Sequence, residues 1–177
     1  MKKVVPFLIV ALVLLATPVM AGKSFPNLDL SGKLSEKQKA YLGVAADSFK
    51  LSDIKADYLF VEGYSMYCPV CQRDATRLND VYKAVSLMDS KGSIKFLGLA
   101  LGNTQFEVEF YKKKYTVEFP LFQDEEYEIH KALGEVPTPV FYIVKLGPTL
   151  EVVYEKVGEA ENKDVLLKAI KETTGLK

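Results

Sequence analysis

Both cysteines of this chain lie in one tetrapeptide, Cys-Pro-Val-Cys at residues 68–71. An apolar run from Tyr58 to Val61 precedes it, and apolar residues recur at spacings of three and four after it. The first pattern is typical of a buried strand, and the second is typical of one face of a helix. The tetrapeptide therefore lies at the start of a helix that follows closely on a strand.

This position predicts a redox site with two unequal thiols. Cys68 falls in the first turn of the helix, where free backbone N–H groups and the positive end of the helix dipole favour a thiolate. Cys71 shares the inward face of the helix with Ala75 and Leu78. We therefore expect Cys68 to be the exposed, acidic thiol and Cys71 to be the sheltered one.

Other uses of the two cysteines are weaker but stay open. A structural disulfide across so short a loop would stabilise the fold by only about 2 kcal/mol. A closed zinc or iron–sulfur site needs four ligands, and two cysteines with the single histidine, His130, cannot supply four from sulfur and nitrogen. The alternative from another functional class is a binding protein that carries copper on the two thiolates, which suit that soft ion.

The first 21 residues have the features of a secretory signal peptide. A basic start, residues 1–3, is followed by an apolar run at 4–16 and by small residues before Gly22. If cleavage fails, this run tethers the protein to a membrane, although it is shorter than the ~20 residues that a spanning helix needs. Cysteines of exported proteins are normally oxidised, so a working dithiol here implies a reducing partner.

The charge balance gives no sign of a nucleic-acid or membrane-surface partner. The chain has 23 basic and 23 acidic residues, and removal of residues 1–21, which hold two lysines and no acid, leaves 23 − 2 = 21 against 23. The remaining chain is long enough for one domain with its own core. We expect an N-terminal extension at 22–57 that packs on a main domain at 58–177, in a monomer without a cofactor.

Strands and helices alternate after the cysteine helix. The expected elements are a strand at 94–101 buried on both faces, a helix opened by a capping box of Thr104 and Glu107, a strand and small helix inserted at 117–135, an antiparallel hairpin at 140–157 and a closing helix at 162–174. The first half of this order requires right-handed crossovers. The sequence therefore predicts an α/β fold, a central mixed sheet with helices on both faces.

Three points of the sequence resemble the thioredoxin superfamily: the Cys-x-x-Cys at a helix start, Asp74, and Thr138-Pro139 before a late apolar strand. The signal peptide, the N-terminal extension and the strand–helix insert make residues 49–175 most similar to the exported TlpA-like thiol-disulfide oxidoreductases of the redoxin group. The resemblance implies a thioredoxin-like fold. It also implies an enzyme that exchanges thiols and disulfides with client proteins through a mixed disulfide.

The resemblance assigns a role to each matching position. Cys68 matches the attacking thiol, Cys71 matches the resolving thiol, and Pro139 matches the family's cis-proline. Asp74 matches an acid found after the motif in TlpA-like proteins, and Glu62 stands at the place of the buried acid of thioredoxin. If strand alternation buries Glu62 under the motif, desolvation should raise its pKa and make it the proton acceptor for Cys71.

The residues expected to contact substrate surround the dithiol. They are Tyr67, Pro69, Val70, Thr138 and Pro139. Most members have Trp where Tyr67 stands, so we expect an altered docking surface with the same chemistry. Neither Pro69 nor Val70 has a side-chain hydrogen-bond donor for the thiolate, which predicts a reducing dithiol rather than a strong oxidant.

The resemblance implies an exported, periplasmic or extracytoplasmic protein that receives electrons from a membrane thiol reductase. The peroxiredoxin signature requires Pro seven residues and Thr three residues before the reactive cysteine, but Val61 and Ser65 stand there. Thiol peroxidase activity is therefore a minor alternative. Copper carriers of this general fold place a histidine near the late proline, and His130, amid charged neighbours on a predicted helix, is expected to be a surface residue.

Overall fold

The computed structural model describes residues 22–177, so the predicted signal peptide lies outside the described residues. The elements are β1 (Asp29–Ser31), α1 (Glu36–Leu42), β2 (Ser48–Lys50), a 3-10 turn (Leu51–Asp53), β3 (Tyr58–Tyr64), α2 (Pro69–Met88), β4 (Ile94–Leu101), α3 (Gln105–Tyr115), β5 (Leu121–Asp124), α4 (Glu128–Ala132), β6 (Val140–Lys145), β7 (Glu151–Val157) and α5 (Lys163–Thr174). In this part of the chain, no helix has the length and apolar character to cross a bilayer.

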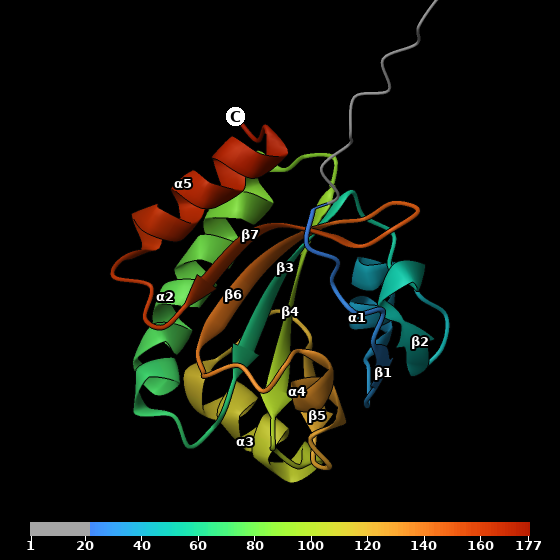
Figure 1. Ribbon diagram of the computed structural model, residues 1–177, viewed down its shortest axis with the longest axis vertical. Helices are drawn as coiled ribbons and strands as arrows, with labels where there is room; N and C mark the ends of the chain where they lie inside the picture. Colours follow the sequence, from blue (N-terminus) through green and yellow to red (C-terminus); the bar gives the residue numbers. More distant parts are fainter. Residues whose placement is uncertain (1–21) are drawn as a thin grey trace, which may run out of the picture.

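A five-stranded mixed sheet forms the centre of the molecule (Figure 1). Its order is β5-β4-β3-β6-β7, with β3 parallel to β4 and β4 parallel to β5. β6 and β7 form the predicted hairpin, and β6 runs antiparallel to β3. The strand that leads to the dithiol therefore lies in the middle of the sheet, where both its edges are paired.

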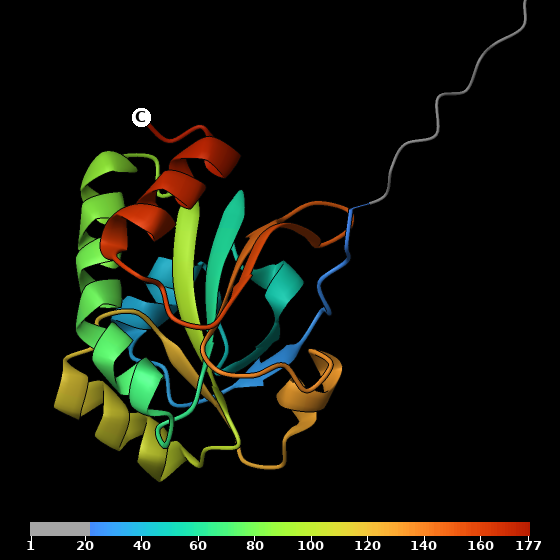
Figure 2. The same ribbon diagram turned by 60° about the vertical axis from the view of Figure 1, so that its left-hand side comes forward.

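Each face of the sheet carries its own hydrophobic core. Helices α2, α3 and α5 cover one face, where Phe60 of β3 and Phe96 of β4 stack at a ring separation of 4.5 Å. The N-terminal segment and α4 cover the other face, where Leu30 and Leu51 pack with Leu59 of β3. Figure 2 shows α2 and α5 packed side by side on their face of the sheet.

The N-terminal segment forms a small sheet of its own. β1 covers Asp29–Ser31 and pairs with β2 in a separate two-stranded sheet. Pro26, which has no N–H to donate to a strand ladder, precedes it. Helix α1 begins at the Ser35 cap and ends at Gly43, whose φ of 71° suits glycine.

The periodic segments agree closely with the sequence prediction. Helix α2 begins with Pro69 at its first position and ends just before Asp89, and α3 begins at the predicted capping box. Leu59 and Val61 of β3 point to the N-terminal face, so the alternating residues Phe60 and Glu62 point to α2. This alternation brings an acidic side chain under the cysteine helix.

Candidate active site

Cys68 is the N-cap residue of α2. Its Sγ accepts a hydrogen bond from the backbone N–H of Cys71 at 3.3 Å, and Pro69 follows at a helix position that needs no N–H. Partial burial acts against ionisation of this thiol, but hydrogen bonds from Cys71 outweigh it, so the pKa of Cys68 is lowered. The half-buried thiol therefore has the electrostatic setting of a nucleophile.

The loop before β6 approaches Cys68 from a distant part of the sequence. The peptide bond between Thr138 and Pro139 is cis, and the Cys68 thiol lies 3.5 Å from the carbonyl oxygen of Thr138. Pro139 is buried, whereas Thr138 is half-buried. The structure thus brings the predicted Thr138-Pro139 pair against the predicted nucleophile.

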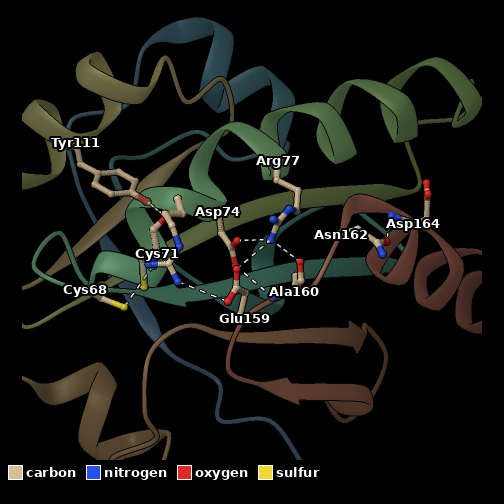
Figure 3. Close-up of polar contacts among 10 residues, drawn as sticks. Cys68, Cys71, Asp74, Arg77, Tyr111, Glu159, Ala160, Asn162 and Asp164 are labelled. Atoms are coloured by element: carbon tan, nitrogen blue, oxygen red, sulfur yellow. Dashed lines mark hydrogen bonds and ion pairs between the residues drawn. The ribbon is translucent and has the colours of Figure 1, made fainter.

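Cys71 lies one turn further along α2 and is fully buried. Burial raises the pKa of its thiol well above the ordinary value, and the neighbouring Cys68 and Glu62 act in the same direction. The hydroxyl of Tyr111 in α3 donates to the carbonyl oxygen of Cys71 at 2.9 Å (Figure 3). The second thiol is therefore protonated at neutral pH and needs a base before it can attack.

Glu62 projects from β3 toward the dithiol and is only 2% exposed. Its Oε1 has no hydrogen-bond partner among the described residues. Burial, followed by the charges of Asp74 and Cys68, raises the pKa of Glu62 to about 8. A carboxyl group in this state can accept or return a proton near neutral pH, as a base for Cys71 must.

Asp74 is the centre of a polar network between α2 and the loop that joins β7 to α5 (Figure 3). One of its carboxylate oxygens accepts the N–H of Ala160 at 3.2 Å, and the other pairs with Arg77. Arg77 also donates to the carbonyl oxygen of Ala160 and lies 3.9 Å from Glu159. Burial raises the pKa of Asp74, although the Ala160 N–H and Arg77 oppose this shift.

Sequence reasoning missed the partners that hold the predicted residues. Arg77 stands three residues after Asp74, a spacing that could have indicated a pair on one helix face. Ala160 and Tyr111 are 86 and 40 residues away from the groups they bind, and no local pattern connects them. Both contacts depend on the packing of distant elements against α2.

Tyr67 and Tyr64 have opposite environments. Tyr67 is 66% exposed beside Cys68, and its hydroxyl donates to the carboxylate of Glu107 in α3. Tyr64 is fully buried, with its ring 4.5 Å from that of Tyr111. Only Tyr67 is therefore available to a partner, together with the exposed Pro69 and the half-buried Val70.

His130 is less exposed than expected. Its Nε2 lies 2.9 Å from the carbonyl oxygen of Val136, and its backbone N–H donates to Asp124 at 2.9 Å. The side chain is half-buried because it packs against the loop that leads to Thr138. Within residues 22–177 no three His, Cys, Asp or Glu side chains are grouped as metal ligands would be.

A model of the AhpC/TSA family matches residues 21–153 of this chain. The thiol-disulfide oxidoreductase ResA of Bacillus subtilis strain 168 is 24% identical over 161 residues, which cover 87% of this chain and 88% of that protein. ResA of Geobacillus thermodenitrificans is 23% identical over 130 residues, covering 67% and 72% of the two chains.

Solved structures with the same architecture confirm the predicted thioredoxin-like fold. A secreted disulfide oxidoreductase of Mycobacterium tuberculosis, homologous to DsbE of E. coli, has a TM-score of 0.61 at 17% identity and covers 82% of this chain and 96% of its own. The thioredoxin domain of a thiol-disulfide oxidoreductase from Bacteroides vulgatus has a TM-score of 0.64 at 14% identity, covering 87% and 97%.

Proposed function

The chain belongs to the AhpC/TSA family of thioredoxin-like proteins, and from this membership and its two unequal thiols we propose that it is an extracytoplasmic thiol-disulfide oxidoreductase that reduces client proteins. The observation that carries the proposal is the contrast between Cys68 and Cys71. One thiol is accessible with a lowered pKa, and the other is buried with a raised pKa. Exchange through a mixed disulfide needs this pair of properties.

In the first step the Cys68 thiolate attacks one sulfur of a client disulfide. A bond forms between Cys68 and that sulfur, the client S–S bond breaks, and the other client sulfur leaves as a thiolate. Pro139 and Thr138 flank the reacting sulfur, and the backbone before the proline is available to an extended client segment.

In the second step Glu62 takes the proton of Cys71, and the Cys71 thiolate attacks Cys68. The Cys68–Cys71 disulfide forms, the bond between Cys68 and the client sulfur breaks, and that sulfur leaves as a thiolate that then takes up a proton. Two electrons have then passed from the protein to the client, and a membrane thiol reductase must return them before the next cycle. Export by the signal peptide at residues 1–21 places the dithiol where such a donor is needed.

A trapping experiment tests this function. In a Cys71→Ala variant the second step cannot occur, so Cys68 should stay joined to its client as a covalent complex that dithiothreitol releases. Cys68 of the reduced wild type should also alkylate before Cys71. A Cys68→Ala variant is the matched control, and equal amounts of complex in the two variants would rule out the proposed order of attack.

Two alternative activities share the same sulfurs and have direct tests. A copper carrier would bind Cu(I) stoichiometrically through Cys68 and Cys71 in a titration of the reduced protein. If the protein is a thiol peroxidase, hydrogen peroxide should oxidise Cys68 much faster than it oxidises a free thiol. Val61 and Ser65 stand where peroxiredoxins have Pro and Thr, so we expect only slow peroxide reduction.

A further inference from the structure

Four exposed aromatic side chains lie on segments that are joined to the start of the cysteine helix: the residue before Cys68, helix α3 and the residue before α4. These residues, called here the aromatic face, are Tyr67, Phe106, Phe110 and Tyr127, with exposures of 66%, 79%, 50% and 50%. Large exposed apolar patches are unusual on soluble proteins and mark interaction sites. Tyr67 precedes the attacking Cys68 directly, so the aromatic face begins at the reacting sulfur.

Helix α3 fixes two of these side chains relative to Tyr67. Glu107 accepts the Tyr67 hydroxyl with one carboxylate oxygen, and its other oxygen accepts the N–H of the cap residue Thr104 at 2.7 Å. Phe106 and Phe110 are four residues apart and therefore share one side of α3. The capping box thus holds Tyr67 within one helical turn of two exposed phenylalanines.

The loop between β4 and α3 connects the remaining aromatic residue. A Cβ atom at Gly102 would lie 2.4 Å from the ring of Tyr127, so this ring rests directly on the glycine backbone. The next residue, Asn103, accepts the N–H of Met66 at 2.8 Å through its Oδ1. The segment before Cys68, the start of α3 and Tyr127 are therefore connected by direct contacts through residues 102–103 of this loop.

Carboxylates border this surface. Glu107, Glu109, Glu125 and Glu126 lie on its elements, and within residues 22–177 no Lys or Arg nitrogen lies within 4 Å of their carboxylate oxygens. The Lys131 ammonium donates to the backbone carbonyl oxygen of Glu126 at 3.4 Å. The cations of α3, residues 112–114, lie in its last turn, and the Lys114 Nζ lies 5.8 Å from the ring centroid of Phe110, at the end of the face away from Tyr67. The end of the aromatic face next to Cys68 is therefore negative, and it complements a positive partner.

We propose that the aromatic face binds the client polypeptide next to its disulfide and selects segments that carry an apolar side chain and a Lys or Arg within a few residues of the reacting cysteine. This inference rests on the proposed function and names its substrate class. Folded proteins bury most large apolar side chains, so the segments selected in this way are those of unfolded or partly folded clients. The aromatic face supplies apolar contact, and the carboxylates supply charge pairing.

The test uses peptides whose single cysteine forms a mixed disulfide with thionitrobenzoate. Cys68 attacks the peptide sulfur, the coloured thionitrobenzoate leaves, and Cys71 then releases the peptide as a thiol with formation of the Cys68–Cys71 disulfide. Four peptides differ only in the flanks of the cysteine: Ser only, Leu and Phe, Leu and Phe with Lys, and Leu and Phe with Glu. Hydroxyethyl disulfide serves as the reference without a peptide, and each peptide rate is divided by the reference rate.

We expect the apolar peptide with Lys to react about tenfold faster than the Ser peptide, because an apolar side chain that leaves water contributes enough free energy for that ratio. The combined Phe106→Ser and Phe110→Ser variant should lose this preference. The combined Glu125→Lys and Glu126→Lys variant should prefer the Glu peptide instead, and its charge preference should fall at high salt.

Leu87→Ser is the matched control, since Leu87 is an equally apolar side chain, 87% exposed, on α2. It should keep the wild-type preference. Equal rates for the four peptides, or a loss of preference in the Leu87→Ser variant equal to that at Phe106 and Phe110, would overturn the inference while the reference reaction still supports thiol-disulfide exchange. Absence of the reference reaction would instead overturn the proposed function, and the client class with it.

Discussion

Glu62 places an ionisable group where water does not reach it, and this has a consequence for stability. In the unfolded chain the carboxyl has an ordinary pKa, whereas in the folded protein burial raises the pKa to about 8. The folded state therefore binds a proton that the unfolded state has lost, and stability falls as the pH rises from about 4.5 to 8.

Replacement of Glu62 by Gln removes this dependence. We expect the variant to be more stable than the wild type by about 4 kcal/mol at pH 8, since each unit of pKa difference corresponds to about 1.4 kcal/mol, and to differ little at pH 4. Urea unfolding at the two pH values measures the effect. The same variant should form the mixed disulfide normally but resolve it slowly, and unchanged resolution would assign the proton transfer to Asp74 or water.

At the scale of elements, Arg77 and Arg73 of α2 are a matched pair for mutagenesis. Both lie near Glu159, at 3.9 Å and 3.5 Å, but only Arg77 contacts the buried Asp74. Loss of Arg77 should raise the pKa of Asp74 further, so that Asp74 carries less negative charge where Glu62 titrates and raises the pKa of Glu62 by less. The pH midpoint of the resolving step should therefore fall in Arg77→Met, as it should in Asp74→Asn.

Arg73→Met is the control for this prediction: Arg73 acts on Asp74 only through its charge, without contact, and its own partner Glu159 is exposed, so its effect on the midpoint should be smaller. The groups that face Glu62 and could also shift the midpoint are Cys68, Cys71 and Asp74 of α2, Tyr64 of its own strand and Tyr111 of α3. In an Asp74→Asn background, Arg77→Met should have no further effect on the midpoint. An additional shift there would show that Arg77 acts directly on the dithiol.

The elements themselves could be predicted from local signals, and the site could be predicted in part. The spacing of apolar residues after Cys68 predicted one helix, the Thr104–Glu107 box predicted the start of another, and the apolar run at 94–101 predicted a buried strand. The burial of Glu62 was expected only on condition that the strand alternates, and the structure meets that condition. The hydrogen bond from the Ala160 N–H to Asp74 could not be predicted, because it forms only after α5 has packed beside α2.

At the scale of the whole molecule, the direction of electron flow depends on how strongly the fold stabilises negative charge on the Cys68 thiolate. The thiolate of Cys68 receives hydrogen bonds from backbone groups and the Cys71 thiol, while Glu62 and Asp74 lie on the same side of the sheet. When these carboxyl groups are ionised, their negative charge disfavours the Cys68 thiolate and therefore the reduced form, so the disulfide should resist reduction.

We therefore expect a reduction potential below roughly −200 mV. Equilibration of the protein with a series of glutathione or dithiothreitol redox buffers, followed by alkylation of the free thiols, measures it. A value near the ~ −120 mV of a strong periplasmic oxidant would assign the protein to disulfide donation instead. The Asp74→Asn variant should have a less negative potential than the wild type, because it removes one of the two acidic groups.

The separation of the two hydrophobic cores by the sheet has a practical consequence for anyone who modifies this protein. Residues 22–57 pack on the face opposite to α2, and the strand between the two layers presents Val61 to one side and Glu62 to the other. Fluorophores, affinity tags or fused partners attached along that N-terminal layer have no direct route to the sulfurs. Immobilisation through this layer leaves Cys68 facing the solution, which suits the protein to capture of clients on a solid support.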